Sequence, residues 1–275
     1  MIDILQYGFM RNALMAGVLA SIACGMVGSF VVVKRMVFIS GGISHSAFGG
    51  IGLGYLAGFN PVLGAIIFAI LSALGIGVIT ERTRRQDTAI GILWAVGMAS
   101  GVIFIGLSRG YAPDLFTYLF GNILTVPSSD IILMLVLDGI IITTILCFYK
   151  EFIAISFDEE YAKTTGIPVH LVNLILLCLI ALTIVVLIRV VGIILVIALL
   201  TIPSATANQF VSDMRRLFWL SILLGVVFTI SGLAISYTLN LPSGATIIIL
   251  AGVIFAISSA VKSLISKRKS FDFAS

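Results

Sequence analysis

The sequence predicts an all-α protein that crosses a membrane many times. Hydrophobic residues make up 60% of its 275 positions and charged residues only 10%, whereas about a quarter of the residues in a soluble globular domain are charged. Apolar runs of about 20 residues recur along the chain, and this is the length that a helix needs to cross a bilayer. The composition excludes an ordinary cytosolic enzyme, a disordered chain and a nucleic-acid-binding domain. We expect residues 1–275 to form a single transmembrane domain.

The apolar runs predict about nine membrane spans. They are expected at Phe9–Val33, Phe38–Gly58, Pro61–Thr80, Thr88–Ser108, Ile131–Tyr149, Val169–Ile188, Val191–Asn208, Leu217–Leu239 and Ala245–Leu264. A further run, Phe116–Val126, is too short to cross, so we interpret it as a re-entrant or interfacial helix. A short hinge at Arg189 is expected to separate the sixth span from the seventh.

The basic residues indicate the orientation of the chain, because cytoplasmic loops carry an excess of Lys and Arg. If the N-terminus is outside and the C-terminus in the cytoplasm, all but three of the 16 Lys and Arg residues lie on the cytoplasmic side. The exceptions are Arg11, Arg109 and Arg189. The net charge of +4 therefore reflects orientation and gives no reason to expect a nucleic-acid partner.

The second expected span carries an ionisable residue, His45, near its middle. Such a side chain is costly within a bilayer and calls for a specific partner or role. On a helix, three glycines share the face of His45 and two serines flank it. These residues are Gly41, Gly49, Gly52, Ser44 and Ser46. Two interpretations stay open with about equal weight: another helix packs closely on this glycine strip, or the strip lines an ion pathway.

Asp138 lies near the middle of the fifth expected span. Its span contains no neighbouring residue of a metal-ligating type. A structural pair or a protonated, hydrogen-bonded carboxyl group is therefore favoured over a role as a transport ligand.

The hydrophilic segment at about residues 156–168 differs from the other loops, because it has an acidic start and a Gly-x-Pro end at the spacing of a short helix. Its candidate contact residues are Asp158, Glu159, Glu160, Ala162 and Gly166. A rigid helix of this kind suits the groove of a partner protein, and a solvated connector is the plainer alternative.

Six stretches of the sequence together resemble the permease subunits of ABC importers for zinc, manganese and iron(II). They are GSFVVVKRM (Gly28–Met36), GGISHSAFGGIGLGY (Gly41–Tyr55), DTAIGI (Asp87–Ile92), DLFTYLFGNILTV (Asp114–Val126), SFDEEYAKTTGIP (Ser156–Pro168) and VGIILVIALLTIPSATA (Val191–Ala207). These stretches follow one another in the order that the family has, over nearly the whole chain.

The resemblance implies an all-helical permease of the type II ABC importer kind, working as a homodimer in the plasma membrane of a prokaryote. It would receive a divalent ion from an extracytoplasmic binding protein and be driven by two ATPase subunits that bind the ATP. His45 matches a family histidine that lines the ion pathway, and residues 156–168 match the coupling segment that docks on the ATPase. The chain has no GxxxxGK[ST] phosphate loop, so we expect neither an enzyme nor a resident cofactor.

One departure from the family concerns the choice of ion. Many members carry an aspartate four residues before the pathway histidine, where this chain has Gly41. Carboxylate oxygens favour harder ions such as manganese, so the loss of this aspartate makes zinc the first choice, with manganese or iron(II) next. Asp138 is a distant candidate for an oxygen ligand. A stand-alone secondary carrier or channel for metal ions is the alternative function, which would need coupling or selectivity groups within its own spans.

Overall fold

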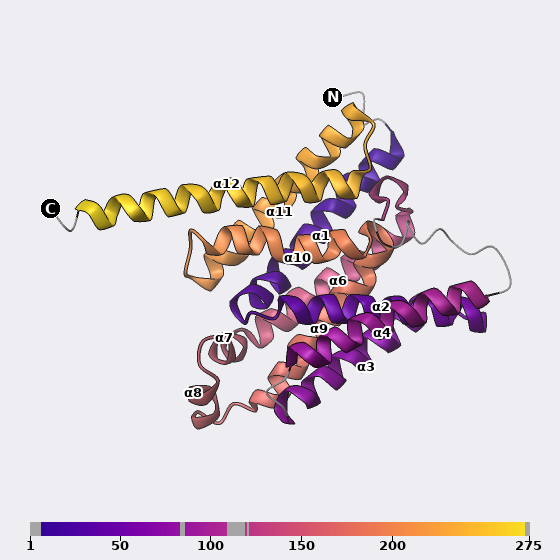
Figure 1. Cartoon of the computed structure of the whole chain (residues 1–275), viewed down its shortest axis with the longest axis horizontal. Helices are drawn as coiled ribbons and strands as arrows, with labels where there is room; N and C mark the ends of the chain where they lie inside the picture. The colour runs from indigo at the N-terminus through magenta and orange to yellow at the C-terminus, as the bar shows by residue number, and fades with distance from the viewer. Residues whose placement is uncertain (1–6, 83–85, 109–118, 120, 273–275) are drawn as a thin grey trace.

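The computed structural model describes the backbone of residues 7–82, 86–108, 119 and 121–272. The helices in chain order are α1 (Gly8–Val33), α2 (Val37–Ala57), α3 (Pro61–Arg82), α4 (Gln86–Leu107), the 3₁₀ helix η2 (Ile123–Thr125), α6 (Ser128–Cys147), α7 (Tyr149–Phe157), α8 (Glu159–Thr164), α9 (Val169–Val191), α10 (Ile193–Asn208), α11 (Met214–Leu239) and α12 (Ser243–Asp272). The all-α prediction is confirmed for the described part of the chain (Figure 1).

Seven of the nine expected spans correspond to described helices that are long and apolar enough to cross a membrane. The exceptions are α2 and α10. Helix α2 has 21 residues, but its serines, glycines and histidine make it less apolar, whereas α10 has only 16 residues. Most of α2 is buried among other helices, so it does not need an apolar surface facing lipid. The prediction of nine spans is therefore not confirmed.

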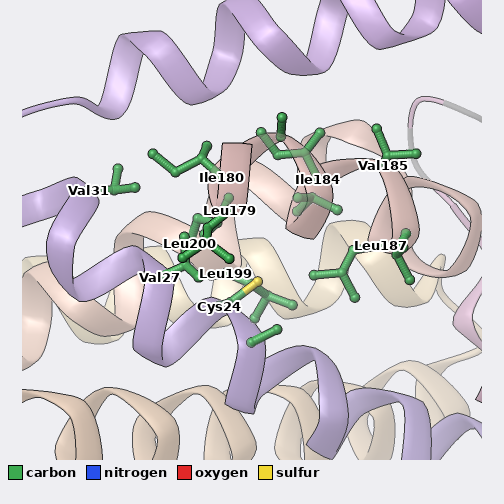
Figure 2. Close-up of a cluster of buried hydrophobic side chains, with 14 of the residues drawn as sticks. Cys24, Val27, Val31, Leu179, Ile180, Ile184, Val185, Leu187, Leu199 and Leu200 are labelled. Atoms are coloured by element: carbon green, nitrogen blue, oxygen red, sulfur yellow. The ribbon is translucent and has the colours of Figure 1, made fainter. Parts of the chain in front are cut away.

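Helix α1 lies at the centre of the fold, packed against α6, α9, α10 and α11. Its contact with α10 is close, because a Cβ atom on Gly28 would overlap the carbonyl oxygen of Leu200. Figure 2 shows the apolar cluster at this centre, in which Cys24, Val27 and Val31 of α1 meet side chains of α9 and α10. Cys24 is thus a packing residue, as its apolar surroundings in the sequence suggest.

Helices α2, α3 and α4 form a group at one side of the molecule, with α2 packed against the other two and against α9 (Figure 1). Gly50 of α2 and Gly64 of α3 lie so close that a Cβ atom on either would overlap the other's carbonyl oxygen. Helix α4 makes most of its contacts with α2, and Ile92, Val96 and Ile103 on its outer side are exposed. The position of α4 therefore depends chiefly on its seam with α2.

A tight corner, Lys34–Met36, joins α1 to α2. The amide of Met36 donates to the carbonyl oxygen of Val31 at 2.8 Å, and that of Arg35 donates to Val32 at 3.1 Å. This pair of bonds defines a Schellman motif, in which the residue with positive φ is usually glycine. Here that residue is Arg35, with φ of 58°. The corner leaves little freedom between the end of α1 and the start of α2.

The expected hinge at Arg189 is wrong, because this residue lies in the last turn of α9. The chain instead breaks at Gly192, whose φ of 81° and ψ of 162° belong to a region that essentially only glycine adopts. The chain therefore breaks where the backbone needs a conformation open only to glycine, and not at the charged residue.

The expected re-entrant helix, Phe116–Val126, falls partly outside the described residues, which omit 116–118 and 120. Its described end contains only the short helix η2, preceded by Asn122, whose side chain accepts from the amide of Leu124 at 3.2 Å. The re-entrant interpretation stays a prediction. Helix α7, which lies between α6 and α8, was not anticipated, so the segment after the fifth span is more helical than expected.

Candidate functional site

His45 is held in the seam between α2 and α4. Its side chain is buried, with 8% of the residue exposed. The imidazole ring stacks on the ring of Trp94, with ring centroids 4.5 Å apart and an interplanar angle of 20°. Its Nδ1 atom lies 3.3 Å from the sulfur of Met98. Both partners come from α4, so the imidazole of His45 faces the neighbouring helix rather than lipid.

The contact with Met98 constrains the tautomer of His45. A thioether sulfur can accept a hydrogen bond but has no hydrogen to donate. The contact therefore favours the neutral tautomer with its proton on Nδ1, which leaves the lone pair on Nε2. A lone pair of this kind is the part of an imidazole that binds a metal ion.

The glycine strip of α2 faces the same seam. A Cβ atom on Gly41 would lie 2.6 Å from the Trp94 ring, and one on Gly49 would lie 3.0 Å from the carbonyl oxygen of Gly97. One on Gly52 would lie 2.7 Å from the carbonyl oxygen of Gly101. The strip thus lets the backbones of α2 and α4 approach closely around His45, which is the packing arrangement that small residues permit.

The two serines beside His45 point elsewhere. Ser44 donates to the carbonyl oxygen of Ser40 in its own helix at 2.7 Å. Ser46 makes a short hydrogen bond with the hydroxyl group of Ser72 in α3. The Ser44 hydroxyl is thus bonded within α2 and the Ser46 hydroxyl links α2 to α3, so both already have partners.

Asp138 does not join His45. It is buried on α6, which packs against α1, α7 and α9, whereas α2 packs mainly against α3, α4 and α9. One carboxylate oxygen of Asp138, Oδ2, has no hydrogen-bond partner among the described residues. A buried carboxylate left unpaired is costly. The role of Asp138, whether in a structural pair, as a protonated carboxyl group or as a transport ligand, stays a prediction.

The donors around His45 suit a passing ion better than a bound one. Among the described residues, no group of three or more His, Cys, Asp and Glu side chains could hold a metal ion. Since the Met98 sulfur faces Nδ1, the imidazole offers one free donor atom, Nε2, whereas stable metal sites commonly use three or four donors. A single free imidazole nitrogen fits weak, reversible contact with a metal ion better than a resident metal site.

Trp94 and Met98 were not identified as site residues from the sequence. They are spaced i and i+4 on α4, so they share one face of that helix. The same spacing is common in packed cores, and only the pairing of α4 with α2 shows which face they line.

The segment expected to contact a partner forms helix α8. Asp158 is its N-cap, and the carboxylate accepts from the amide of Tyr161 at 2.9 Å. Gly166, with φ of 82°, follows the end of the helix. Ala162 is fully buried, so it anchors α8 to the body of the molecule and cannot make the outward contact expected of it. Glu160 and Tyr161 are exposed instead.

Glu159 is tied to the rest of the fold by Lys34. The Nζ atom of Lys34 lies 2.9 Å from Glu159 Oε1, and Asn173 Nδ2 lies 3.4 Å from the same oxygen. Burial by itself would raise the pKa of Glu159, but Lys34, Asn173 and Lys163 outweigh it and hold this pKa below its usual value. The stabilisation is present above the ordinary glutamate pKa and lost only as the pH falls through the lowered one, so the pair is intact at neutral pH.

A cavity of about 710 Å³ opens beside this ion pair, near the ends of α1 and α3, the starts of α2 and α9, and α8. Its polar lining comes from Lys34, Glu159, Lys163, His170 and Asn173. The cavity leaves one side of the pair free of packed side chains.

The chain matches known proteins over nearly its whole length. Residues 6–262 match the family model ABC-3, described as the ABC 3 transport family. An uncharacterized membrane protein of Synechocystis is 50% identical over 263 residues, which cover 95% of this chain and 94% of that protein. The manganese transport system membrane protein MntC of Listeria innocua is 38% identical over 256 residues, covering 93% and 91%.

The fold is similar to that of a solved structure described as PsaBC from Streptococcus pneumoniae in complex with Fab. The TM-score is 0.85 at 35% sequence identity, and the match covers 94% of this chain and 93% of that chain. The family resemblance noted in the sequence is thereby confirmed. Because the family model spans most of the chain and the relatives align over almost all of theirs, this protein belongs to the ABC 3 transport family.

Proposed function

We propose that this chain is the membrane-spanning subunit of an ABC importer that moves a divalent transition-metal ion, with manganese as the first choice, into the cytoplasm. The observation that carries the proposal is the buried His45, held by Trp94 and Met98 in the seam between α2 and α4 of a chain from this family. The catalytic ATP hydrolysis belongs to separate ATPase subunits.

The order of ions differs from the one that the sequence favours. The absence of a carboxylate at Gly41 makes zinc the first expectation. Relatives aligned over most of their length, however, are named for manganese transport. A pathway that holds its ion only weakly leaves the selection of the ion to the partner that delivers it. We therefore follow the names of the aligned relatives and place manganese first.

The proposed pathway follows the seam at His45 and is completed by a second copy of the chain. Trp94 covers the imidazole and is itself 37% exposed, and the outer side of α4 is apolar and exposed. A homodimer contact here would bring the seams of the two copies to either side of one axis.

The proposed contact with the ATPase is the exposed side of α7 and α8. Phe157 is 64% exposed and Tyr161 is 62% exposed, and Glu160 lies beside them. Exposed aromatic side chains are typical anchors of protein interfaces. Asp158 and Gly166 shape this helix, and Glu159 and Ala162 attach it to the fold. The distribution of Lys and Arg supports a cytoplasmic position of this end and an N-terminus outside.

The test is metal uptake by the complete complex in proteoliposomes, with ATP inside or outside and the binding protein supplied at the opposite face. We expect ATP-driven accumulation of manganese, with zinc and iron(II) competing according to their affinity for the binding protein. Uptake that proceeds at the same rate without the ATPase would instead support the stand-alone carrier or channel. Absence of uptake of all three ions by an assembled, ATP-hydrolysing complex would refute metal transport.

A further inference from the structure

The ammonium group of Lys34 joins two distant parts of the chain. Its Nζ atom donates to Glu159 Oε1 at 2.9 Å and to the carbonyl oxygen of Ile155 at 2.7 Å. Its side chain is only 8% exposed, whereas that of Glu159 is 49% exposed. A mostly buried ammonium group with two charge-complementary partners has few alternative positions, because any other would leave the charge unpaired.

Lys34 also belongs to the corner that begins α2. It caps α1, and the two hydrogen bonds of Arg35 and Met36 leave the corner little freedom. Helix α2 starts at Val37, eight residues before His45, which corresponds to about 12 Å along a helix. A displacement of Lys34 therefore moves the start of the helix that carries the proposed pathway residue.

Glu159 and Ile155 lie on α8 and α7, the two short helices proposed to contact the ATPase. Helix α8 itself packs chiefly on α7 and α9. Helix α9 is embedded among α1, α2, α3, α6 and α10, so it shifts only if the core repacks. The ion pair, by contrast, borders the 710 Å³ cavity, so one side of the pair is free of packed side chains.

We propose that the Lys34–Glu159 ion pair transmits the movement of α8 to the start of α2, and so couples the ATPase to the ion pathway. The inference rests on the proposed function, since it assigns a route to the coupling that this function requires. Lys34 and Glu159 act as positioning residues in it, because neither touches the transported ion or ATP. If the ion pair only stabilised the position of α8, its loss would leave the number of ions transported per ATP hydrolysed unchanged.

The experiment measures this ratio in proteoliposomes for the complete complex carrying Glu159→Gln. This change keeps the size of the side chain and one acceptor oxygen but removes its charge. We expect ATPase subunits to co-purify normally and ATP hydrolysis to continue, while the ions transported per ATP fall by about tenfold. Lys34→Arg, which keeps the charge and can still reach both partners, should retain most of the ratio. Lys150→Met on α7 is the matched control for loss of a charge near this end.

The exchange variant Lys34→Glu/Glu159→Lys tests the pairing itself, and recovery of the ratio above that of Glu159→Gln would support it. A wild-type ratio in Glu159→Gln would overturn the proposal. A loss in the Lys150→Met control as large as that in Glu159→Gln would overturn it too, because any charge lost near α8 would then suffice. Failure of the proposed function is distinguishable, since the wild-type complex would then show no ATP-driven uptake at all.

Discussion

Two ionisable side chains hold α2, Lys34 at the corner that begins the helix and His45 near its middle, and they are bound in different ways. At the corner, Lys34 meets a carboxylate at 2.9 Å and a carbonyl oxygen at 2.7 Å, which are strong, charge-assisted contacts. In the seam, His45 has an aromatic face and a thioether sulfur, which are weak partners. Lys34 is thus committed to its protein partners, whereas His45 keeps a lone pair that a metal ion could use. The difference separates a group that positions a helix from a group that can exchange ligands.

The largest expected effect comes from opening the seam that presents His45. In Gly49→Leu the new side chain would collide with Ser100 and the backbone of Gly97, so we expect loss of uptake and a destabilisation of at least about 1–3 kcal/mol. Gly91→Leu is the control on α4, because a Cβ atom there meets nothing within 4 Å. Thermal stability in detergent and uptake in proteoliposomes measure both. Equal stability and uptake in the two variants would mean that transport does not require close packing of α2 on α4.

His45 itself should give the next largest effect. We expect His45→Ala and His45→Asn to lower uptake by at least about tenfold, equivalent to about 1.4 kcal/mol of ion binding, with ATPase assembly intact. Asparagine can still form hydrogen bonds but is a much poorer ligand for a transition metal than imidazole. Wild-type uptake in the Asn variant would show that His45 packs rather than binds, and the contrast with Lys34 would then disappear.

Met98 should have a smaller effect, because it acts through the orientation of His45. Met98→Leu conserves volume but removes the acceptor for Nδ1, so we expect uptake to fall by roughly tenfold or less. Met98→Gln places an amide oxygen at a similar distance from the backbone and should restore part of the loss. The two variants are compared by initial rates of metal uptake at several ion concentrations. If Gln is no better than Leu, the sulfur contributes only packing.

The smallest expected effect lies at the corner. Arg35→Gly should stabilise the protein by about 0.5–1 kcal/mol, because glycine adopts φ of 58° without steric cost. Arg35→Val should instead destabilise it, since a β-branched side chain fits poorly at positive φ. Melting temperatures of the purified protein distinguish the two. A lower melting temperature for the glycine variant would show that the Arg35 side chain makes a stabilising contact that outweighs the backbone strain.

Much of the fold could be predicted from local sequence features. Apolar runs located the long helices, and the acidic cap at Asp158 with the stop at Gly166 located α8, because each signal comes from residues close in the chain. Features that depend on packing were missed. Ala162 was expected to face a partner but is fully buried, and the break assigned to Arg189 belongs to Gly192.

The candidate site shows the same division. The sequence by itself identified His45 as exceptional, because an ionisable group in an apolar run is costly wherever the helix lies. It also determined that the chain is a membrane protein and that its motifs follow one family. Only the tertiary structure decided which helix faces the glycine strip, that Trp94 and Met98 hold the imidazole, and that Asp138 lies elsewhere. The tertiary structure alone shows that Lys34 pairs with Glu159, 125 residues later in the sequence. Contacts between distant segments depend on how helices pack, and local residue patterns do not record that packing.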